Sequence, residues 1–97
     1  MNIVICGAGV IGTAIAYALA ERGVGATLVE AVAPACAASG KSGGFLALDW
    51  CDGSPMQALA RRSFALHQDL GRRFGERTGY RALDTLAVVA TEVPYDL

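Results

Sequence analysis

Three glycines near the N-terminus follow the spacing G-x-G-x-x-G: Gly7, Gly9 and Gly12. In a turn between a strand and a helix, the first permits the tight turn, the second admits a pyrophosphate close to the backbone, and the third lets the helix pack on the sheet. The N–H groups of Val10 and Ile11 would then face the phosphate charge. The pattern predicts a dinucleotide site; a glycine-rich packing turn without a ligand is the alternative.

An acidic residue, Glu30, lies 23 positions after Gly7. A carboxylate at the end of the second strand of such a unit can accept hydrogen bonds from ribose hydroxyls, and it disfavours a 2′-phosphate. We therefore expect NADP to be a poor ligand, which leaves FAD and NAD as the candidates.

A second group of polar and glycine residues follows this unit: Ser39, Lys41, Ser42, Gly43 and Gly44. Such residues can bring hydroxyl and backbone donors against another part of the ligand, and the lysine can add charge near phosphate. A long ligand such as FAD suits this segment better than NAD does. A flexible surface loop is the alternative interpretation.

Local patterns predict the elements that position these residues. A short β-branched run at residues 3–6 reads as a buried strand, an alanine-rich stretch at 10–22 as a helix that stops at Gly23, and residues 26–30 as a second buried strand. This order is a βαβ unit. We therefore predict an α/β fold, an incomplete Rossmann-like FAD/NAD(P)-binding domain whose missing strands leave exposed apolar sheet edges.

The remainder of the chain is predicted as a loop, a helix and a strand. Residues 31–54 lack periodicity, and long loops in compact domains are usually functional. Ser54 as N-cap, Pro55 at the first helical position and Gln57 two positions later form a capping box that starts a helix. Its apolar face should comprise Met56, Leu59, Leu66, Leu70 and Phe74. Residues 86–90 are a strand candidate.

Residues 3–44 resemble the N-terminal flavin-binding segment of the D-amino-acid oxidase-like FAD-dependent oxidoreductases. The extended fingerprint that carries the resemblance comprises Gly7, Gly9, Gly12, Ala16, Leu19, Gly23 and Glu30. The run from Ala38 to Cys51, which reads ASGKSGGFLALDWC, is similar to a narrower group of FAD-dependent oxidoreductases from fungi and plants. The resemblance extends over roughly residues 1–90.

The resemblance implies a two-domain enzyme that binds FAD and oxidises a C–N bond of a small amine or amino acid. It places Gly7, Gly9 and Gly12 at the pyrophosphate, Glu30 at the adenosine ribose, and Ser39 with residues 42–44 along the pyrophosphate toward the flavin. Family members run to several hundred residues, so residues 1–97 are expected to be the N-terminal part of the FAD-binding domain without the substrate domain. The residues that act on substrate are therefore not identified. A non-catalytic dinucleotide-binding module and an NAD-dependent dehydrogenase fragment are the alternatives.

Composition excludes several other classes. The 97 residues carry 8 basic and 9 acidic side chains, which argues against a dedicated nucleic-acid binder. Three cysteines at scattered positions (Cys6, Cys36 and Cys51) indicate neither a disulfide framework nor a zinc site, and reduced thiols suit the cytoplasm. The first twenty residues are uncharged, but they lack a basic leader and contain three glycines, so neither a signal peptide nor a membrane span is expected.

Overall fold

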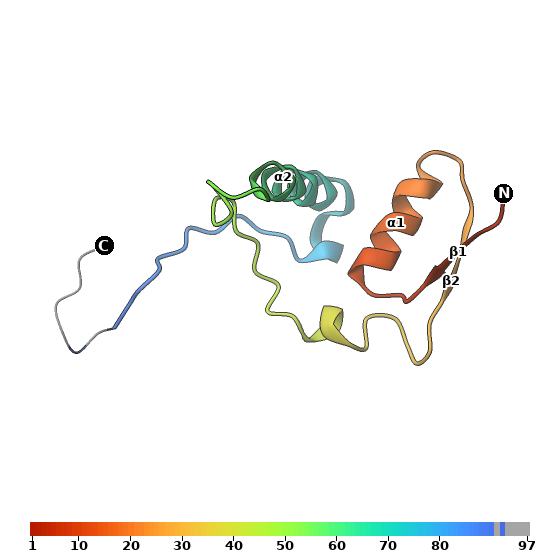
Figure 1. The fold of residues 1–97 in the computed structure, drawn as a ribbon, viewed down its shortest axis with the longest axis horizontal. Helices are drawn as coiled ribbons and strands as arrows, with labels where there is room; N and C mark the ends of the chain where they lie inside the picture. The colour runs from red at the N-terminus through yellow and green to blue at the C-terminus, as the bar shows by residue number, and fades with distance from the viewer. Residues whose placement is uncertain (91, 93–97) are drawn as a thin grey trace. The chain divides into compact units, whose positions relative to one another are not determined.

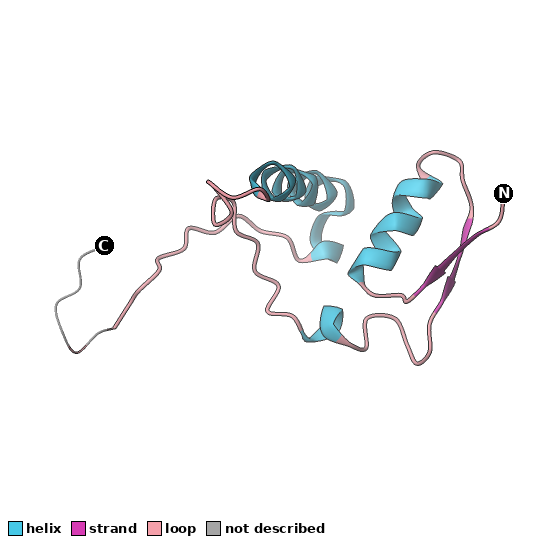
Figure 2. Cartoon of the chain, in the orientation of Figure 1, coloured by secondary structure: helices cyan, strands magenta, loops and turns pink. Residues whose placement is uncertain are grey.

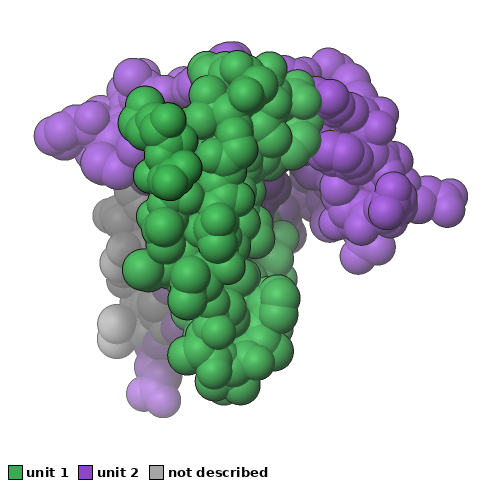
Figure 3. Space-filling model, turned by 90° about the vertical axis from the view of Figure 1, so that its right-hand side faces the viewer, with its two compact units in different colours: residues 1–45 green, residues 46–97 purple. Residues whose placement is uncertain are grey.

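The chain consists of two compact units, Met1–Phe45 and Leu46–Leu97, coloured separately in Figure 3. A computed structural model describes residues 1–90 and 92. The first unit contains both strands and the glycine-rich turn, and the second contains the long helix.

The first unit is a βαβ unit (Figures 1 and 2). Strand β1 (Ile3–Cys6), helix α1 (Val10–Ala20) and strand β2 (Ala26–Val29) follow one another along the chain. The two strands pair in parallel, with Ile3 opposite Ala26 and Cys6 opposite Val29. The predicted α/β architecture is therefore confirmed, and a short 3-10 helix, η1 (Ala38–Lys41), follows in the loop.

Side chains alternate along both strands because successive residues of a strand point to opposite faces. Ile5 is half-buried beneath α1, and its Cγ2 lies 3.3 Å from where a Cβ on Gly12 would stand. The strand residues that point to the opposite face are exposed, with Val4 61% and Val29 53% accessible. Ala8 is the one buried hydrophobic residue of the described chain. No residue of either strand is fully buried, so the prediction that both strands are buried is wrong, because one helix covers a two-stranded sheet incompletely. In the described chain both strands are edges of that sheet and carry exposed apolar side chains, as expected of a domain with missing strands.

Helix α1 ends two residues before the predicted boundary. The N–H of Gly23 donates to the carbonyl of Ala20 at 2.9 Å, and the N–H of Val24 donates to that of Leu19 at 3.0 Å. Gly23 has a φ of +72°, a left-handed conformation that glycine adopts without steric cost. The predicted stop at Gly23 is thus confirmed, while the preceding residues form the closing turn.

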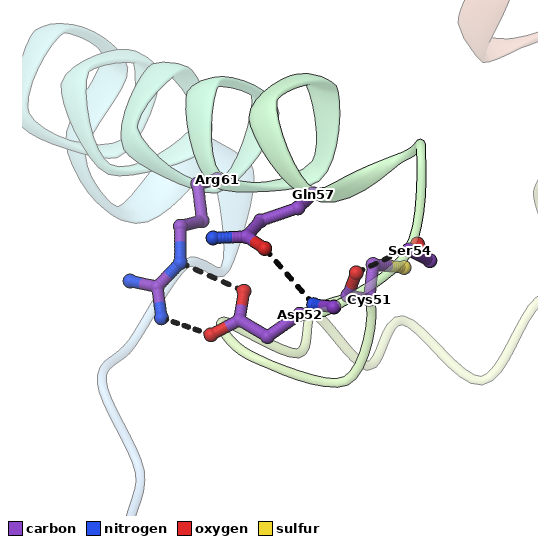
Figure 4. Close-up of polar contacts among 6 residues, drawn as sticks. Cys51, Asp52, Ser54, Gln57 and Arg61 are labelled. Carbon is purple, nitrogen blue, oxygen red and sulfur yellow. Dashed lines mark hydrogen bonds and ion pairs between the residues drawn. The ribbon is translucent and has the colours of Figure 1, made fainter.

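Helix α2 (Gln57–Phe74) begins later than the capping-box pattern predicts. The Ser54 hydroxyl accepts a hydrogen bond from the N–H of Met56 at 3.2 Å. The Gln57 side chain accepts one from the N–H of Gly53 at 2.9 Å (Figure 4). Both polar side chains therefore cap backbone groups, but within the turn that precedes the helix. The predicted N-cap at Ser54 is wrong because Met56 occupies that position.

An ion pair joins this turn to α2. The Arg61 guanidinium donates from Nε to Oδ1 of Asp52 at 2.8 Å and from Nη2 to Oδ2 of the same carboxylate (Figure 4). This paired hydrogen bond holds the pKa of Asp52 below its ordinary value. Because both side chains are partly exposed, the pair orients the turn more than it stabilises the unit.

The apolar face predicted for α2 is largely exposed, with Leu59 59% and Leu66 42% accessible. The chain turns back through a 3-10 helix, η2 (Gly75–Thr78), and the Tyr80 ring lies against Gly71. A Cβ on Gly71 would stand 2.6 Å from that ring. The half-buried face of α2 shares only Leu70 with the predicted one, and its members are Ala60, Ser63, Phe64, His67, Leu70 and Gly71.

The strand predicted at residues 86–90 does not form. Residues 79–90 contain neither helix nor strand, and Leu86 and Val88 are 86% and 78% accessible. A strand needs a neighbour for its backbone hydrogen bonds, and β1 and β2 are the only strands of the described residues. Among the described residues 1–90 and 92, neither α-helix is both long enough and apolar enough to cross a membrane.

Candidate dinucleotide site

The glycine-rich turn lies between the end of β1 and the start of α1. Gly7 has a φ of +99°, which permits the sharp change of direction, and its N–H donates to the carbonyl of Val29 at 2.7 Å. Gly9 is the N-cap of α1 in an extended conformation. The turn therefore brings the end of β1, the end of β2 and the N-terminus of α1 together.

Gly12 is required for the close packing of α1 on this turn. A Cβ at Gly12 would stand 2.0 Å from the carbonyl oxygen of Gly7, a distance that no real Cβ contact reaches. Gly12 is also buried. The role predicted for the third glycine of the pattern, close approach of helix and strand, matches this geometry.

The N-terminus of α1 presents backbone N–H groups to one point. Val10 donates its N–H to the Ser39 hydroxyl at 2.8 Å. The N–H groups of Ile11 and Gly12 have no hydrogen-bond acceptor among residues 1–90 and 92. Free N–H groups and the positive end of the helix dipole favour an anion at this position. Of the two donors predicted from the sequence, Ile11 remains available and Val10 is engaged by Ser39.

Glu30 follows β2 and reaches the same turn. Its Oε2 accepts a hydrogen bond from the N–H of Ala8 at 2.9 Å, and its Oε1 accepts one from the N–H of Val32 at 3.1 Å. Each carboxylate oxygen retains a lone pair for a further donor. The side chain is therefore fixed at the end of β2, where ribose hydroxyls of a dinucleotide would meet it.

The hydrogen bonds from Ala8 and Val32 hold the pKa of Glu30 below its ordinary value of 4.5, against a smaller opposing effect of desolvation. A lowered pKa in the folded state means that ionised Glu30 stabilises the fold. This contribution is present above about pH 4.5 and is lost as the pH falls through the folded-state pKa. We expect Glu30→Gln to lower the melting temperature at pH 7, and we expect the difference from wild type to shrink as the pH falls below 4.5 and through the lowered pKa of Glu30.

Thermal melting of both proteins between pH 7 and pH 3 checks this dependence. Glu76→Gln is the matched control, because Glu76 lies on the exposed turn η2 and should leave the pH profile unchanged. A Glu30→Gln deficit that stays constant over the whole pH range would show that the carboxylate charge is not what stabilises the turn.

The glycine and serine segment reaches the turn through Ser39 alone among its predicted site residues. Lys41 ends η1, is exposed and forms no ion pair with another described residue. Ser42, Gly43 and Gly44 are exposed and form no hydrogen bond to the turn in the described part of the chain. Ligand contacts for these four residues stay predictions.

Sequence reasoning missed three residues that complete the arrangement. Ala35 donates its N–H to the carbonyl of Ala8 at 3.0 Å, and Val32 supplies one of the N–H groups that hold Glu30. Gly40 leaves no room for a side chain, since a Cβ there would stand 2.1 Å from the carbonyl oxygen of Ala35. Of these three, only Gly40 could have been noticed in the sequence, as a glycine between two polar residues. Ala35 and Val32 contribute backbone N–H groups, which their residue types do not reveal.

A family of known proteins matches most of this chain. The family model described as FAD dependent oxidoreductase matches residues 2–95. A Schizosaccharomyces pombe protein that is named as an oxidoreductase is 41% identical to this chain over 100 aligned residues. The alignment covers 94% of this chain and 26% of that protein. The bifunctional protein of tRNA 5-methylaminomethyl-2-thiouridine biosynthesis from Chromohalobacter salexigens is 51% identical over 45 residues, or 46% of this chain and 6% of that protein.

The chain thus spans about a quarter of the length of its S. pombe relative. No solved structure matches it. The family match covers nearly the whole chain, including the glycine-rich turn, Glu30 and the segment that contains Ser39. This chain belongs to the family of FAD-dependent oxidoreductases.

Proposed function

We propose that residues 1–45 hold the ADP portion of FAD in an oxidoreductase that oxidises a C–N bond of a small amine or amino acid. The observation that supports the proposal is that one turn brings together the free N–H groups at the start of α1 and the carboxylate of Glu30. The N–H groups of Ile11 and Gly12 at the start of α1 have no acceptor among the described residues, while Glu30 is fixed beside Ala8. A dinucleotide presents phosphate and ribose at this spacing in βαβ units.

The residues fit a diphosphate and an adenosine ribose. The diphosphate would accept hydrogen bonds from the N-terminus of α1 and from the Ser39 hydroxyl, which already accepts from Val10 and retains its own proton to donate. Glu30 would accept hydrogen bonds from the ribose hydroxyls. Lys41 carries the positive charge closest along the chain to Ser39 and would offset the phosphate charge.

Chemistry at the C–N bond is supported by family membership and by the name of one relative. The C. salexigens protein takes part, by its name, in forming a methylaminomethyl group, in which carbon is bonded to an amine nitrogen. FAD, when bound, supplies the acceptor for the hydride that leaves the carbon. The role of this segment is to bind and orient that cofactor, since positioning and electrostatics are what the protein adds to flavin chemistry.

Competition among nucleotides tests the proposed site. We expect ADP to displace FAD, because the contacts lie in the ADP portion, and we expect FMN to fail. A 2′-phosphorylated ADP should compete at least about tenfold more weakly than ADP, since its extra phosphate meets the Glu30 carboxylate.

Quenching of FAD fluorescence in the presence of each competitor measures these affinities. Equal competition by FMN and ADP would place the contacts on the flavin side and contradict the assignment. Equal competition by ADP and its 2′-phosphorylated form would remove Glu30 from the ribose site.

A further inference from the structure

A short segment, residues 35–40, lies against the glycine-rich turn; we call it the strap. Its first residue, Ala35, donates its N–H to the carbonyl of Ala8 at 3.0 Å. Near its other end, the Ser39 hydroxyl accepts the N–H of Val10 at 2.8 Å, although 29 positions separate the two residues. Both ends of the strap are therefore fixed to the turn.

The strap itself has a strained and closely packed backbone. Ala35 has a φ of +56°, which makes it the one non-glycine residue with positive φ in the described chain. Such a conformation costs free energy and persists only where surrounding contacts impose it. At the other end, Gly40 approaches the carbonyl of Ala35 so closely that a Cβ would stand 2.1 Å from its oxygen. The docked shape of the strap therefore depends on contacts that hold it there.

Gly9 provides the space for the contact at Ser39. A Cβ on Gly9 would stand 2.9 Å from the Ser39 Oγ, while the Ser39 Cβ would be at an ordinary 3.9 Å. Apart from Gly9 itself and its two neighbours in the chain, the hydroxyl oxygen is the only atom of the described residues within 3.5 Å of that position. A side chain at position 9 would thus turn the hydroxyl away and remove its hydrogen bond to Val10.

We infer that the missing side chain of Gly9 leaves a space that receives the Ser39 hydroxyl, and we call this space the seat. We further infer that Ser39 is a positioning residue, which couples docking of the strap to binding of the diphosphate. The inference rests on the proposed FAD site and gives the second glycine of the pattern a partner within the protein. The first glycine sets the turn and the third sets the helix packing, whereas the second admits a side chain from the strap.

The coupling follows from the donors and acceptors of the hydroxyl. Ser39 accepts from Val10 and has no acceptor for its own proton among residues 1–90 and 92. A phosphate oxygen that accepts this proton polarises the hydroxyl and strengthens its bond to Val10. Because coupling between two equilibria is reciprocal, a bound diphosphate favours the docked strap, and a docked strap favours the diphosphate.

A double-mutant cycle with Gly9→Ala and Ser39→Ala tests the seat without any ligand. Amide hydrogen exchange at Val10 is the readout, since that N–H donates to Ser39. We expect each single variant to exchange about fivefold faster than wild type, the worth of one hydrogen bond, and the double variant to exchange no faster than either. Ser39→Thr, which keeps the hydroxyl, should restore the slow exchange.

The same proteins are then tested for ADP binding. Gly9→Ala should weaken ADP binding several-fold relative to wild type. In a protein that already carries Ser39→Ala, adding Gly9→Ala should change ADP binding little. The matched control is Gly25→Ala, because a Cβ there meets no atom within 4 Å and the residue lies outside the site.

Two results would overturn the inference. If Gly9→Ala weakens ADP binding by the same factor with and without Ser39, the glycine acts on the ligand directly. If Val10 exchange is unchanged in both single variants, Gly9 does not seat Ser39. A third result separates the two proposals: coupled exchange at Val10 together with no ADP binding by wild type would support the seat, refute its link to the diphosphate and refute the proposed FAD site.

Discussion

Replacing Gly12 with alanine is expected to unfold the unit Met1–Phe45 and to abolish retention of FAD. The new Cβ would stand 2.0 Å from the backbone carbonyl of Gly7 and 3.3 Å from Ile5, and neither the backbone nor the strand beneath can move aside without loss of the turn. Overpacking costs typically about 1–3 kcal/mol and occasionally more, and a clash with backbone, which cannot rotate away, lies at the upper end. With so few buried residues in this unit, that cost exceeds what the remaining contacts can offset.

Hydrogen exchange of β1 and β2 and the flavin content after desalting measure the two effects. Gly25→Ala is the matched control, since it adds the same methyl group in open space at the start of β2. A Gly12→Ala protein with protected strands and wild-type flavin content would show that α1 does not need to approach the Gly7 carbonyl, and the geometry of the turn would then be wrong.

Replacing Glu30 with alanine is expected to weaken FAD binding between about tenfold and a hundredfold, the range for hydrogen bonds to a charged group. The carboxylate organises the turn through Ala8 and Val32, and in the proposed site it also accepts from the ribose. Its loss removes both contributions. Titration of FAD fluorescence against each protein measures the change.

Two controls separate the contributions of Glu30. Glu30→Asp keeps the charge but shortens the reach, so it should lose much of the affinity for the ribose. Glu76→Ala removes a carboxylate from an exposed turn of the second unit and should bind FAD as wild type does. If Glu30→Ala retains wild-type affinity, the carboxylate serves the fold of the turn alone and the ribose lies elsewhere.

Sequence reasoning predicted the βαβ unit because its signals are local. The β-branched strands, the alanine-rich helix and the glycines between them each fix their own conformation. The parallel pairing of β1 with β2 then follows from the short helical connection. Glu30 was expected at the end of β2, and it lies there, because position along a strand determines which edge of the sheet a residue reaches.

Contacts between distant segments were not predictable in the same way. The hydrogen bond between Val10 and Ser39 depends on the path of an irregular loop, and the left-handed conformation of Ala35 has no signal in its residue type. The strand expected at residues 86–90 has the right composition, but strand formation requires a partner, which composition does not supply. The start of α2 moved because Ser54 and Gln57 can cap a turn as readily as a helix.

Retention of flavin by the 97-residue chain is the decisive measurement for the proposed FAD site. The purified protein is incubated with FAD, freed of unbound ligand, and examined by visible absorption, with its helical content checked by circular dichroism. We expect a flavin spectrum that is shifted from that of free FAD and that is lost in Gly12→Ala. A protein with the expected helical content that emerges colourless would contradict the claim that the turn of residues 7–12, together with Glu30 and Ser39, forms an FAD site.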